Sequence, residues 1–370
     1  MSGKEQIDIV KDACFHHRLC TARAFLGRLK NDFDATSKLI FHCHQPFGQP
    51  QANRCMCIMS TGMHHSLIDR NVASKERLGF FMDFYFVDVF AKEKYQGNQL
   101  AVLVPDRELS TAEMQQIARE INFSEITYIL SGKKENGGYD VRIFTPDSEI
   151  PFAGHPTLGT AYIINKIIER GVETKIILNL EVGQIPVSIN GDNLIMSQNE
   201  PSFGMIIKET DVIANVLTIK QEDIRTDYPI QLVSTGLPCI IVPLKSVDAV
   251  MKCSINHNQF SHFTKNYYKC NLLVFSEEGE SEFRARVFMD NTGFLEDPAT
   301  GSANGNLAGY LLEYNFFSKN KIEYSVNQGY GVNRPSRINV MAEKTDGKFH
   351  IHVGGKVHLV AKGEWFIGGN

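Results

Sequence analysis

The feature that most constrains the fold of this 370-residue chain is a strand-to-helix unit that occurs twice. In the first half, Arg142-Ile-Phe144 leads through an acidic turn to GHPTLGTA. In the second half, Arg286-Val-Phe288 leads through an acidic turn to DPATGSA. Chance similarity between two ordinary strand-loop-helix units is the alternative, but Pro, Thr, Gly and the small residues follow in the same order in both. The repeat predicts two similar lobes.

Hydrophobic periodicity predicts the elements around these two loops. From Met82 onward, aromatic and aliphatic residues alternate in a β-rich run. A capping box from Ser110 to Glu113 predicts a helix that ends near Asn122. Further strands are expected at residues 125–130, 141–145, 272–275 and 284–289, and further helices from residue 157 onward and over residues 302–312. The order of strand, loop and helix is thus the same in both halves.

Composition limits the partners of the chain. A formal net charge of -4, with Lys and Arg scattered along the sequence, argues against nucleic acid as a partner. The apolar fraction of 43% is that of a soluble globular protein, and no apolar run reaches membrane-spanning length. After residue 81 only three cysteines occur, without the spacing of a metal or disulfide framework. These observations, with the lack of a secretion signal at the start of the sequence, predict a cytoplasmic protein.

Residues 1–81 differ in character from the rest of the chain. They mix Cys, His, Arg, Gln and Ser with short apolar stretches, and a helical pattern occurs only around Ile7 to Leu29. The motifs HCH at residues 42–44 and CMC at residues 55–57 raise the alternative of a zinc site, but they lack paired CxxC or HxxxH spacing. The segment is therefore predicted to be a poorly ordered N-terminal extension.

The two repeated loops have the ingredients of an anion site. A helix start offers unpaired backbone N–H groups and the positive end of the peptide dipoles, which attract a carboxylate or phosphate. Glycine lets a ligand approach the backbone closely. Alternatively, Thr157, Thr300 and Ser302 serve only as helix N-caps. Two matched loops that also carry His155 and Asp297 favour a binding site for a small anion.

Glu125, in the segment NFSEITYI, is a third candidate for acid/base chemistry. Its neighbours Phe123, Ile126 and Tyr128 would partly remove its carboxyl group from water, which raises the pKa of a carboxyl group toward the range used in acid/base catalysis. A glutamate exposed at the edge of a sheet would have the same sequence pattern.

From Met82 to its end the chain contains, in this order, the segments MDFYFVDVFAKEKYQGNQLAVL, INFSEITYI, RIFTPDSEIPFAGHPTLGTA, RVFMDNTGFLEDPATGSANG, QGYGVNRPSRI and HVGGKVHLVAKGEW. In these segments and their order the chain resembles the PhzF, or phenazine biosynthesis-like, proteins, which are similar in fold to diaminopimelate epimerase. The resemblance implies an α+β fold of two pseudo-symmetric lobes, each a curved, mostly antiparallel sheet or half-barrel around a central helix. The expected first lobe is 82–205 with a C-terminal strand at 355–370, and the second is 206–354.

The resemblance also implies roles for particular residues. Glu125 would be the catalytic acid/base, whereas the substrate-binding residues would be Gly154, His155, Asp297, Gly301 and Ser302. Related epimerases and racemases use two thiols from these loops. Neither loop contains a cysteine here, so one carboxylate would take up a proton and return it elsewhere on the substrate.

The expected function is therefore that of a cofactor-independent isomerase acting on a small, carboxylate-bearing metabolite. A non-enzymatic PhzF-like protein that binds a metabolite or a protein is the alternative. No dinucleotide-binding glycine motif follows a strand, and no cluster of metal ligands is evident, so neither an organic cofactor nor a metal is expected. A homodimer is the assembly that the resemblance implies.

Overall fold

The computed structural model describes residues 39–42, 58–61, 80–266, 270–289 and 294–367. The chain divides into two compact units, residues 1–75 and 76–370. In the first unit, β1 (Leu39–His42) pairs with β2 (Ile58–Thr61) in antiparallel fashion, which the sequence did not predict. The expected poor order of residues 1–81, the helix around residues 7–29 and the alternative zinc site lie outside the described residues, apart from the backbone of these strands and of residues 80 and 81.

The second unit begins with a series of strands around one buried helix. The helices in the first half of this unit are α4 (Thr111–Ile121) and α5 (Gly154–Ile163). Helix α5 continues as a π-helical turn over Ile164–Ile168. The strands of this half are β3 (Phe80–Val89), β4 (Asn98–Val104), β5 (Ile126–Ile129), β6 (Gly138–Phe144), β7 (Glu149–Ile150), β8 (Lys175–Leu180), β9 (Gly183–Asn190) and β10 (Asn193–Ser197).

The second half of this unit has the same kinds of elements. Its helices are α6 (Thr210–Leu217), α7 (Val247–Lys252), α8 (His257–Asn266) and α9 (Gly301–Glu313), with 3-10 turns at Gln221–Asp223 and Tyr330–Val332. Its strands are β11 (Ser202–Ile207), β12 (Ile230–Ser234), β13 (Cys239–Pro243), β14 (Asn271–Gly279), β15 (Glu282–Phe288), β16 (Glu296–Asp297), β17 (Lys321–Gln328), β18 (Ser336–Thr345) and the long β19 (Lys348–Ile367).

Strand pairing follows one scheme in both halves. The parallel pair β4–β5 is followed by antiparallel β5–β6 and β6–β7, and then by parallel β6–β8 across α5. Likewise, parallel β13–β14 is followed by antiparallel β14–β15 and β15–β16, and then by parallel β15–β17 across α9. Strand β19 pairs with β18, β10 and β3, and the strands together form a mixed sheet with barrel-like closure.

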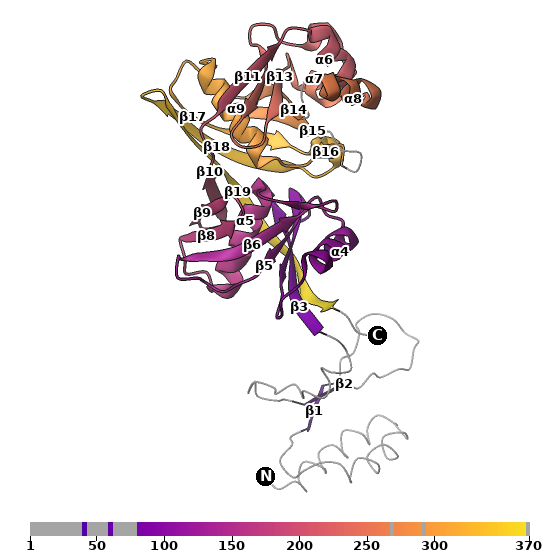
Figure 1. The fold of residues 1–370 in the computed structure, drawn as a ribbon, viewed down its shortest axis with the longest axis vertical. Coiled ribbons are helices and arrows are strands. Elements are labelled where there is room, and N and C mark those ends of the chain that lie inside the picture. Colours follow the sequence, from indigo (N-terminus) through magenta and orange to yellow (C-terminus); the bar gives the residue numbers. More distant parts are fainter. Residues whose placement is uncertain (1–38, 43–57, 62–79, 267–269, 290–293, 368–370) are drawn as a thin grey trace. The chain divides into compact units, whose positions relative to one another are not determined.

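Helices α5 and α9 are buried over almost their whole length, and Figure 1 shows α9 among the strands of its half. Both carry apolar and small residues on every side, as expected for helices enclosed by other elements. Close packing requires some of these small residues. A β-carbon at Gly159 of α5 would lie 2.5 Å from the Cδ2 atom of Leu100 in β4. One hydrophobic cluster contains side chains from both helices, so the two halves share a core.

The structure confirms most of the expected elements and corrects the helix starts. Helix α4 has the capping box at Ser110 and Glu113. Helix α5 begins at Gly154 rather than at Thr157, and α9 begins at Gly301. The idea that Thr157 and Ser302 are N-caps is wrong, because both residues lie inside the helices. The Thr157 hydroxyl instead donates to the Ala153 carbonyl oxygen, one turn back.

The remaining helices cover the outer faces of the strands. Helix α4 packs on β4, β5 and β6 through Met114, Ile117 and Ala118. Helices α6, α7 and α8 lie together on the second half, over a separate hydrophobic cluster that includes Val242 and Val274. None of the helices in the described ranges is long and apolar enough to cross a membrane.

The boundary between the two units predicts that a chain starting at Glu76 folds by itself. All residues of the three hydrophobic clusters follow Glu76, and β3 retains its pairing with both β4 and β19. The shortened chain should elute as a compact species in size-exclusion chromatography and melt within a few degrees of the full chain.

A chain starting at Ala91 is the matched control, because it lacks β3 and should not fold. Aggregation of the Glu76 chain, or a much lower melting temperature, would show that residues 1–75 are part of the folding unit.

Candidate active site

Three titratable side chains from distant parts of the sequence lie close together. Glu125 directly precedes β5, His155 lies in the first turn of α5, and Asp297 ends β16. The Nε2 atom of His155 is 3.6 Å from the Oε2 atom of Glu125. On the other side of the imidazole, the Nδ2 atom of Asn98 lies 3.2 Å from His155 Nδ1 and 2.7 Å from Asp297 Oδ1. The candidate residues of the two loops and of the β5 segment therefore form one cluster.

The two helix starts lie against each other at this cluster. A β-carbon built on Gly154 would lie 3.6 Å from the backbone nitrogen of Ser302 and 3.7 Å from the Cα atom of Gly301. Neither helix has a side chain that caps its first N–H groups. The positive ends of two helices therefore meet at one place, which favours an anionic group.

Burial sets the protonation of this cluster. The side chain of His155 is only 5% exposed, and burial lowers its pKa to about 4, against the opposing effect of the negative charge of Asp297. Burial, followed by the charge of Glu125, raises the pKa of Asp297 to about 6. Burial also raises the pKa of Glu125, against a hydrogen bond from the Ser124 side chain that lowers it. Because His155 is neutral at pH 7, its contact with Glu125 is not an ion pair of two full charges.

Two atoms in this cluster lack a hydrogen-bond partner. Both Glu125 Oε2 and His155 Nε2 are inaccessible to water and make no hydrogen bond. The rest of the Glu125 side chain reaches the surface, since 19% of it is exposed. Buried polar atoms are nearly always paired, so two facing atoms without partners make this cluster a candidate for ligand binding or proton exchange.

Asn98 and Gln328, which were not among the residues expected from the sequence, hold the Asp297 loop together with Thr300. The Thr300 hydroxyl donates to Asp297 Oδ2, and Gln328 Nε2 donates to the Asp297 carbonyl at 2.8 Å and to Thr300 Oγ1 at 3.0 Å. Asn98 donates to the Asp297 carboxylate. Asn98 and Gln328 each lie beside a glycine with positive φ, Gly97 and Gly329, so the dipeptides Gly97-Asn98 and Gln328-Gly329 were the available sequence signal.

A pocket of about 540 Å³ opens beside the cluster. Asn98, Ser124 and Pro298 line its inner side, and Phe123, Phe288 and Leu295 supply apolar walls. Its two arginines are already engaged, since Arg286 pairs with Glu296 and Arg334 pairs with Asp88, both at 2.6 Å. A small molecule with an apolar body and a polar end would fit such walls.

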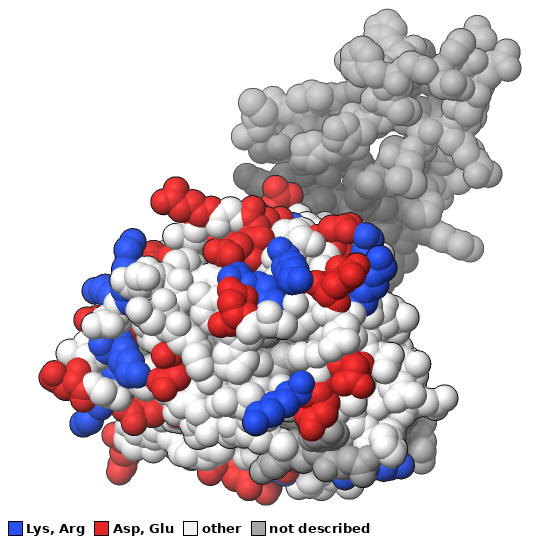
Figure 2. Space-filling model, turned by 90° about the horizontal axis from the view of Figure 1, so that it is seen from above, with Lys and Arg blue, Asp and Glu red and all other residues white. Residues whose placement is uncertain are grey.

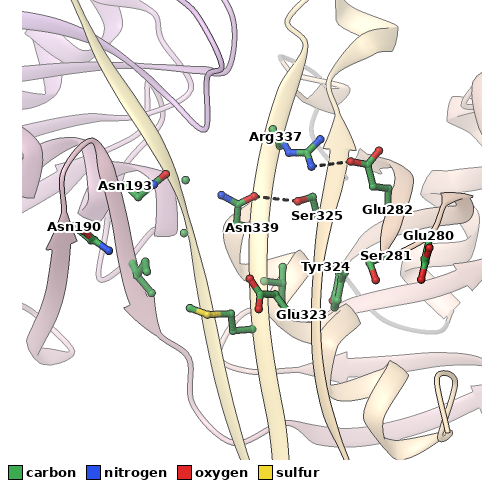
Figure 3. Close-up of a pocket in the computed structure, with 15 residues that line it drawn as sticks. Asn190, Asn193, Glu280, Ser281, Glu282, Glu323, Tyr324, Ser325, Arg337 and Asn339 are labelled. Atoms are coloured by element: carbon green, nitrogen blue, oxygen red, sulfur yellow. Dashed lines mark hydrogen bonds and ion pairs between the residues drawn. The ribbon is translucent and has the colours of Figure 1, made fainter. Parts of the chain in front are cut away.

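A larger pocket lies elsewhere on the molecule. Figure 3 shows this space of about 600 Å³, where Ser325 donates to Asn339 and Arg337 pairs with Glu282. Two pairs of its polar side chains contact each other, and its lining contains neither Glu125 nor the helix starts. The smaller pocket is the better candidate because the cluster of three buried titratable side chains, Glu125, His155 and Asp297, lies next to it.

The described part of the chain contains no group of side chains arranged to bind a metal ion. Within it, no three His, Cys, Asp or Glu side chains are grouped as a metal site. The expectation that the protein needs neither metal nor organic cofactor stays a prediction.

The fold of the chain is similar to the folds of solved PhzF and epimerase structures. It superposes on a PhzF family protein of Bacillus anthracis with a TM-score of 0.70 and 25% identity, over 78% of this chain and 99% of that one. A hydroxyproline epimerase of Agrobacterium vitis shares the fold, with a TM-score of 0.54 and 10% identity over 78% of this chain and 93% of the other.

Sequence comparison gives the family. The family model described as phenazine biosynthesis-like protein matches residues 87–363, and the chain belongs to this PhzF family of isomerases. An isomerase of Clostridium acetobutylicum is 32% identical over 76% of this chain and 96% of its own length. The trans-2,3-dihydro-3-hydroxyanthranilate isomerase of Pseudomonas aeruginosa is 31% identical over 76% of this chain and 98% of its own length. These names support an enzyme and give no support to a non-enzymatic binding protein.

The lowered pKa of His155 predicts how stability depends on pH. Its ordinary pKa of 6.5 falls to about 4 in the folded protein, so the unfolded chain binds a proton first as the pH falls. The free energy of unfolding should therefore decrease between pH 6.5 and about 4, by up to about 3 kcal/mol. A His155→Gln variant lacks this contribution.

Denaturant titrations of both proteins at pH 7 and pH 4.5 measure the effect. Glu125 and Asp297 titrate in both proteins, so the difference between the proteins reports the titration of His155 and its charge interaction with Asp297. Equal pH dependence of the two proteins would contradict the assignment of a neutral, buried imidazole.

Proposed function

We propose that this protein is an isomerase that moves a proton between two positions of a small, carboxylate-bearing metabolite, with Glu125 as the acid/base. The observation that carries this proposal is the facing pair of buried, unpartnered atoms, Glu125 Oε2 and His155 Nε2. A raised pKa lets a carboxyl group hold a proton near neutral pH and give it up to a reaction intermediate. The burial of Glu125 supports this role.

The substrate would lie at the meeting point of the two helix starts. Backbone N–H groups at Gly154, Gly301 and Ser302 would hold its carboxylate, because the positive ends of both helices converge there. His155 and Asp297 would contact the polar groups of the substrate near the reacting carbon. A carboxylate fixed at this place would bring that carbon within reach of Glu125.

The proposal includes two pseudo-symmetric lobes with the substrate between them. The first would comprise residues 82–205 with the C-terminal strand at 355–370, and the second residues 206–354. The repeated order of strand pairs and the position of α5 and α9 in that order support this division. The pairing of Val357–Ile367 with β3 is consistent with a C-terminal strand in the first lobe.

A single carboxylate would carry the proton. The segments FAGHPTLGTA and LEDPATGSANG contain no cysteine, so the chemistry of two opposed thiols is not available at the helix starts. Glu125 would remove a proton from one carbon and return it to another carbon on the same face of the substrate. The apolar walls of the adjacent pocket, including Phe123 and Phe288, suit a ring such as that in the name of the Pseudomonas aeruginosa relative.

The proposed partner is a small anion, not a nucleic acid. On the face that Figure 2 shows, acidic and basic side chains are interspersed, and the net charge of the whole chain is -4. We also propose a homodimer, by analogy with the family. A cytoplasmic location is supported by the buried, free thiols of Cys239 and Cys253, which are typical of a reducing compartment.

Glu125→Gln tests the proposed chemistry. The variant keeps the shape of the side chain but cannot exchange a proton, so turnover of a substrate found by metabolite screening should fall by about a hundredfold to ten thousandfold. Binding of that substrate should change less than turnover, because other residues hold the carboxylate. In deuterated water the wild type should place deuterium in the product.

Glu280→Gln, an exposed carboxylate at the larger pocket, is the control and should leave turnover unchanged. Turnover by Glu125→Gln at the wild-type rate would exclude Glu125 from the reaction.

The absence of a metal requirement is a separate prediction. Because Glu125 alone would exchange the proton, turnover should persist after dialysis against a strong chelator. Loss of turnover that one added metal ion restores would contradict a cofactor-independent mechanism.

A further inference from the structure

Gln328 is a buried residue that contacts the turn between β16 and α9. It is the last residue of β17, and its exposed fraction is 0%. Gly329 follows it with a φ of +78°, and a β-carbon on Gly329 would overlap the carbonyl oxygen of Pro298. The end of β17 is therefore packed directly against the backbone of the loop that precedes α9.

Backbone groups fix the orientation of the Gln328 amide. Its Nε2 atom lies 2.8 Å from the Asp297 carbonyl oxygen, which can only accept. Its Oε1 atom lies 3.4 Å from the Thr300 backbone nitrogen, which can only donate. The amide of Asn304, which also donates to the Thr300 carbonyl oxygen at 2.9 Å, donates to Gln328 Oε1 at 3.0 Å. Turning the Gln328 amide over would set acceptor against acceptor and donor against donor, so its two sides are assigned by these contacts.

This orientation determines the direction of the Thr300 hydroxyl. The two hydrogens on Gln328 Nε2 have two acceptors, the Asp297 carbonyl oxygen and Thr300 Oγ1 at 3.0 Å. The Thr300 oxygen thus receives a hydrogen from Gln328, and it has one hydrogen of its own to donate. Asp297 Oδ2 is the acceptor in contact with it. Gln328, Thr300 and Asp297 therefore form a chain of hydrogen bonds with a single direction.

Both oxygens of the Asp297 carboxylate are acceptors in this arrangement. Thr300 donates to Oδ2, and Asn98 donates to Oδ1 at 2.7 Å. A hydrogen on Asp297 Oδ2 would face the hydrogen of the Thr300 hydroxyl. Donors that point at a carboxylate stabilise its ionised form, so these two bonds hold the pKa of Asp297 below the value that burial alone would give.

Other titratable groups also face Asp297. Burial and then the negative charge of Glu125 raise the pKa of Asp297 to about 6, and a positive charge on His155 would lower it. The adjacent Glu296 forms an ion pair with Arg286 at 2.6 Å. With a pKa of about 6, Asp297 is mainly ionised at pH 7, as its two donors require.

We propose that Gln328 is a positioning residue that directs the Thr300 hydroxyl to Asp297 and thereby fixes the Asp297 carboxylate as a hydrogen-bond acceptor at the start of α9. This inference rests on the proposed function for its meaning in catalysis. A carboxylate fixed as an acceptor binds a donor group of a substrate and offers no hydrogen of its own. Because Gln328 is fully buried, it acts through Thr300 and Asp297 and not by contact with a substrate.

Gln328→Met tests the chain of hydrogen bonds. Methionine has a similar length but no hydrogen to donate, so the Thr300 oxygen becomes able to accept from a protonated Asp297. The pKa of Asp297 should therefore rise from about 6 by about one unit. Carbon-13 NMR of aspartate-labelled protein without substrate follows this titration, and Asp297→Asn assigns the signal. An unchanged Asp297 pKa in folded Gln328→Met would overturn the inference.

Thr300→Val tests whether Gln328 acts through the hydroxyl. Valine keeps the shape of threonine but cannot donate to Asp297, so the pKa of Asp297 should rise in this variant as well. In a protein with both Gln328→Met and Thr300→Val, it should equal the value in Thr300→Val alone. A second rise of similar size in the double variant would contradict the inference.

Gln231→Met is the matched control. Gln231 is also a buried glutamine of the second half, and its hydrogen bonds are to Gly204 and Tyr314, outside the cluster. The Asp297 titration in this variant should match that of the wild type. A rise as large as that in Gln328→Met would show a general effect of lost packing and would remove the specific role of Gln328.

A measurement on the wild type decides the inference if Gln328→Met does not fold. Protonation of Asp297 breaks the direction of the chain at Thr300, so the nitrogen-15 shift of the Gln328 side-chain amide should follow the Asp297 titration. Thr300→Val should weaken this dependence, because it removes the connecting hydroxyl. A Gln328 amide shift that stays constant through the Asp297 titration would overturn the inference.

The proposed function and this inference fail in different ways. On any substrate found by screening, Gln328→Met should move the acid limb of the kcat/KM profile to higher pH, in step with the Asp297 pKa. Wild-type turnover by Glu125→Gln would remove the proposed function but leave the Asp297 titrations intact. An unchanged Asp297 pKa in Gln328→Met would remove the role of Gln328, whatever Glu125→Gln does.

Discussion

The close approach of two buried helix starts is the constraint on which the rest of the site depends. Gly154 of α5 lies against Gly301 and Ser302 of α9, since a β-carbon at Gly154 would be in van der Waals contact with their backbone. Both helices are buried over almost their whole length, and their first residues lie against each other. Side chains on the adjoining turns, His155 and Asp297, are thereby brought into one small volume.

That small volume changes the chemistry of its side chains. Burial lowers the pKa of His155 and raises the pKa values of Glu125 and Asp297, so all three shifts favour neutral forms. Burying these groups in their charged forms lowers the free energy of unfolding, and the surrounding hydrophobic packing offsets this loss. The hydrogen bonds of Asn98 and Thr300 keep Asp297 in place. In the proposed mechanism, the same desolvation that costs stability raises the pKa of Glu125 toward the range of an acid/base catalyst.

The sequence predicted the family, the order of elements and the enzyme class. The capping box at Ser110, the strand pattern from Met82 and the two repeated loops are local patterns. Each depends on residues close together in the sequence, so it can be recognised without knowledge of tertiary contacts. Helix starts were less well predicted, because Thr157 and Ser302 have the residue types of N-caps but lie inside the helices. The actual N-caps, Ala153 and Thr300, make no side-chain capping bond.

The sequence by itself determined the repeat, the PhzF family and a short set of candidate residues, because residue order along the chain carries these directly. Only the tertiary structure decided that Glu125 faces His155, that the two helix starts meet, and that Asn98 joins both loops. Asn98 and Asp297 are separated by 199 positions, and no periodicity relates residues so far apart. Their contact follows from strands that pair across the whole chain, so it exists only once the barrel-like sheet has closed.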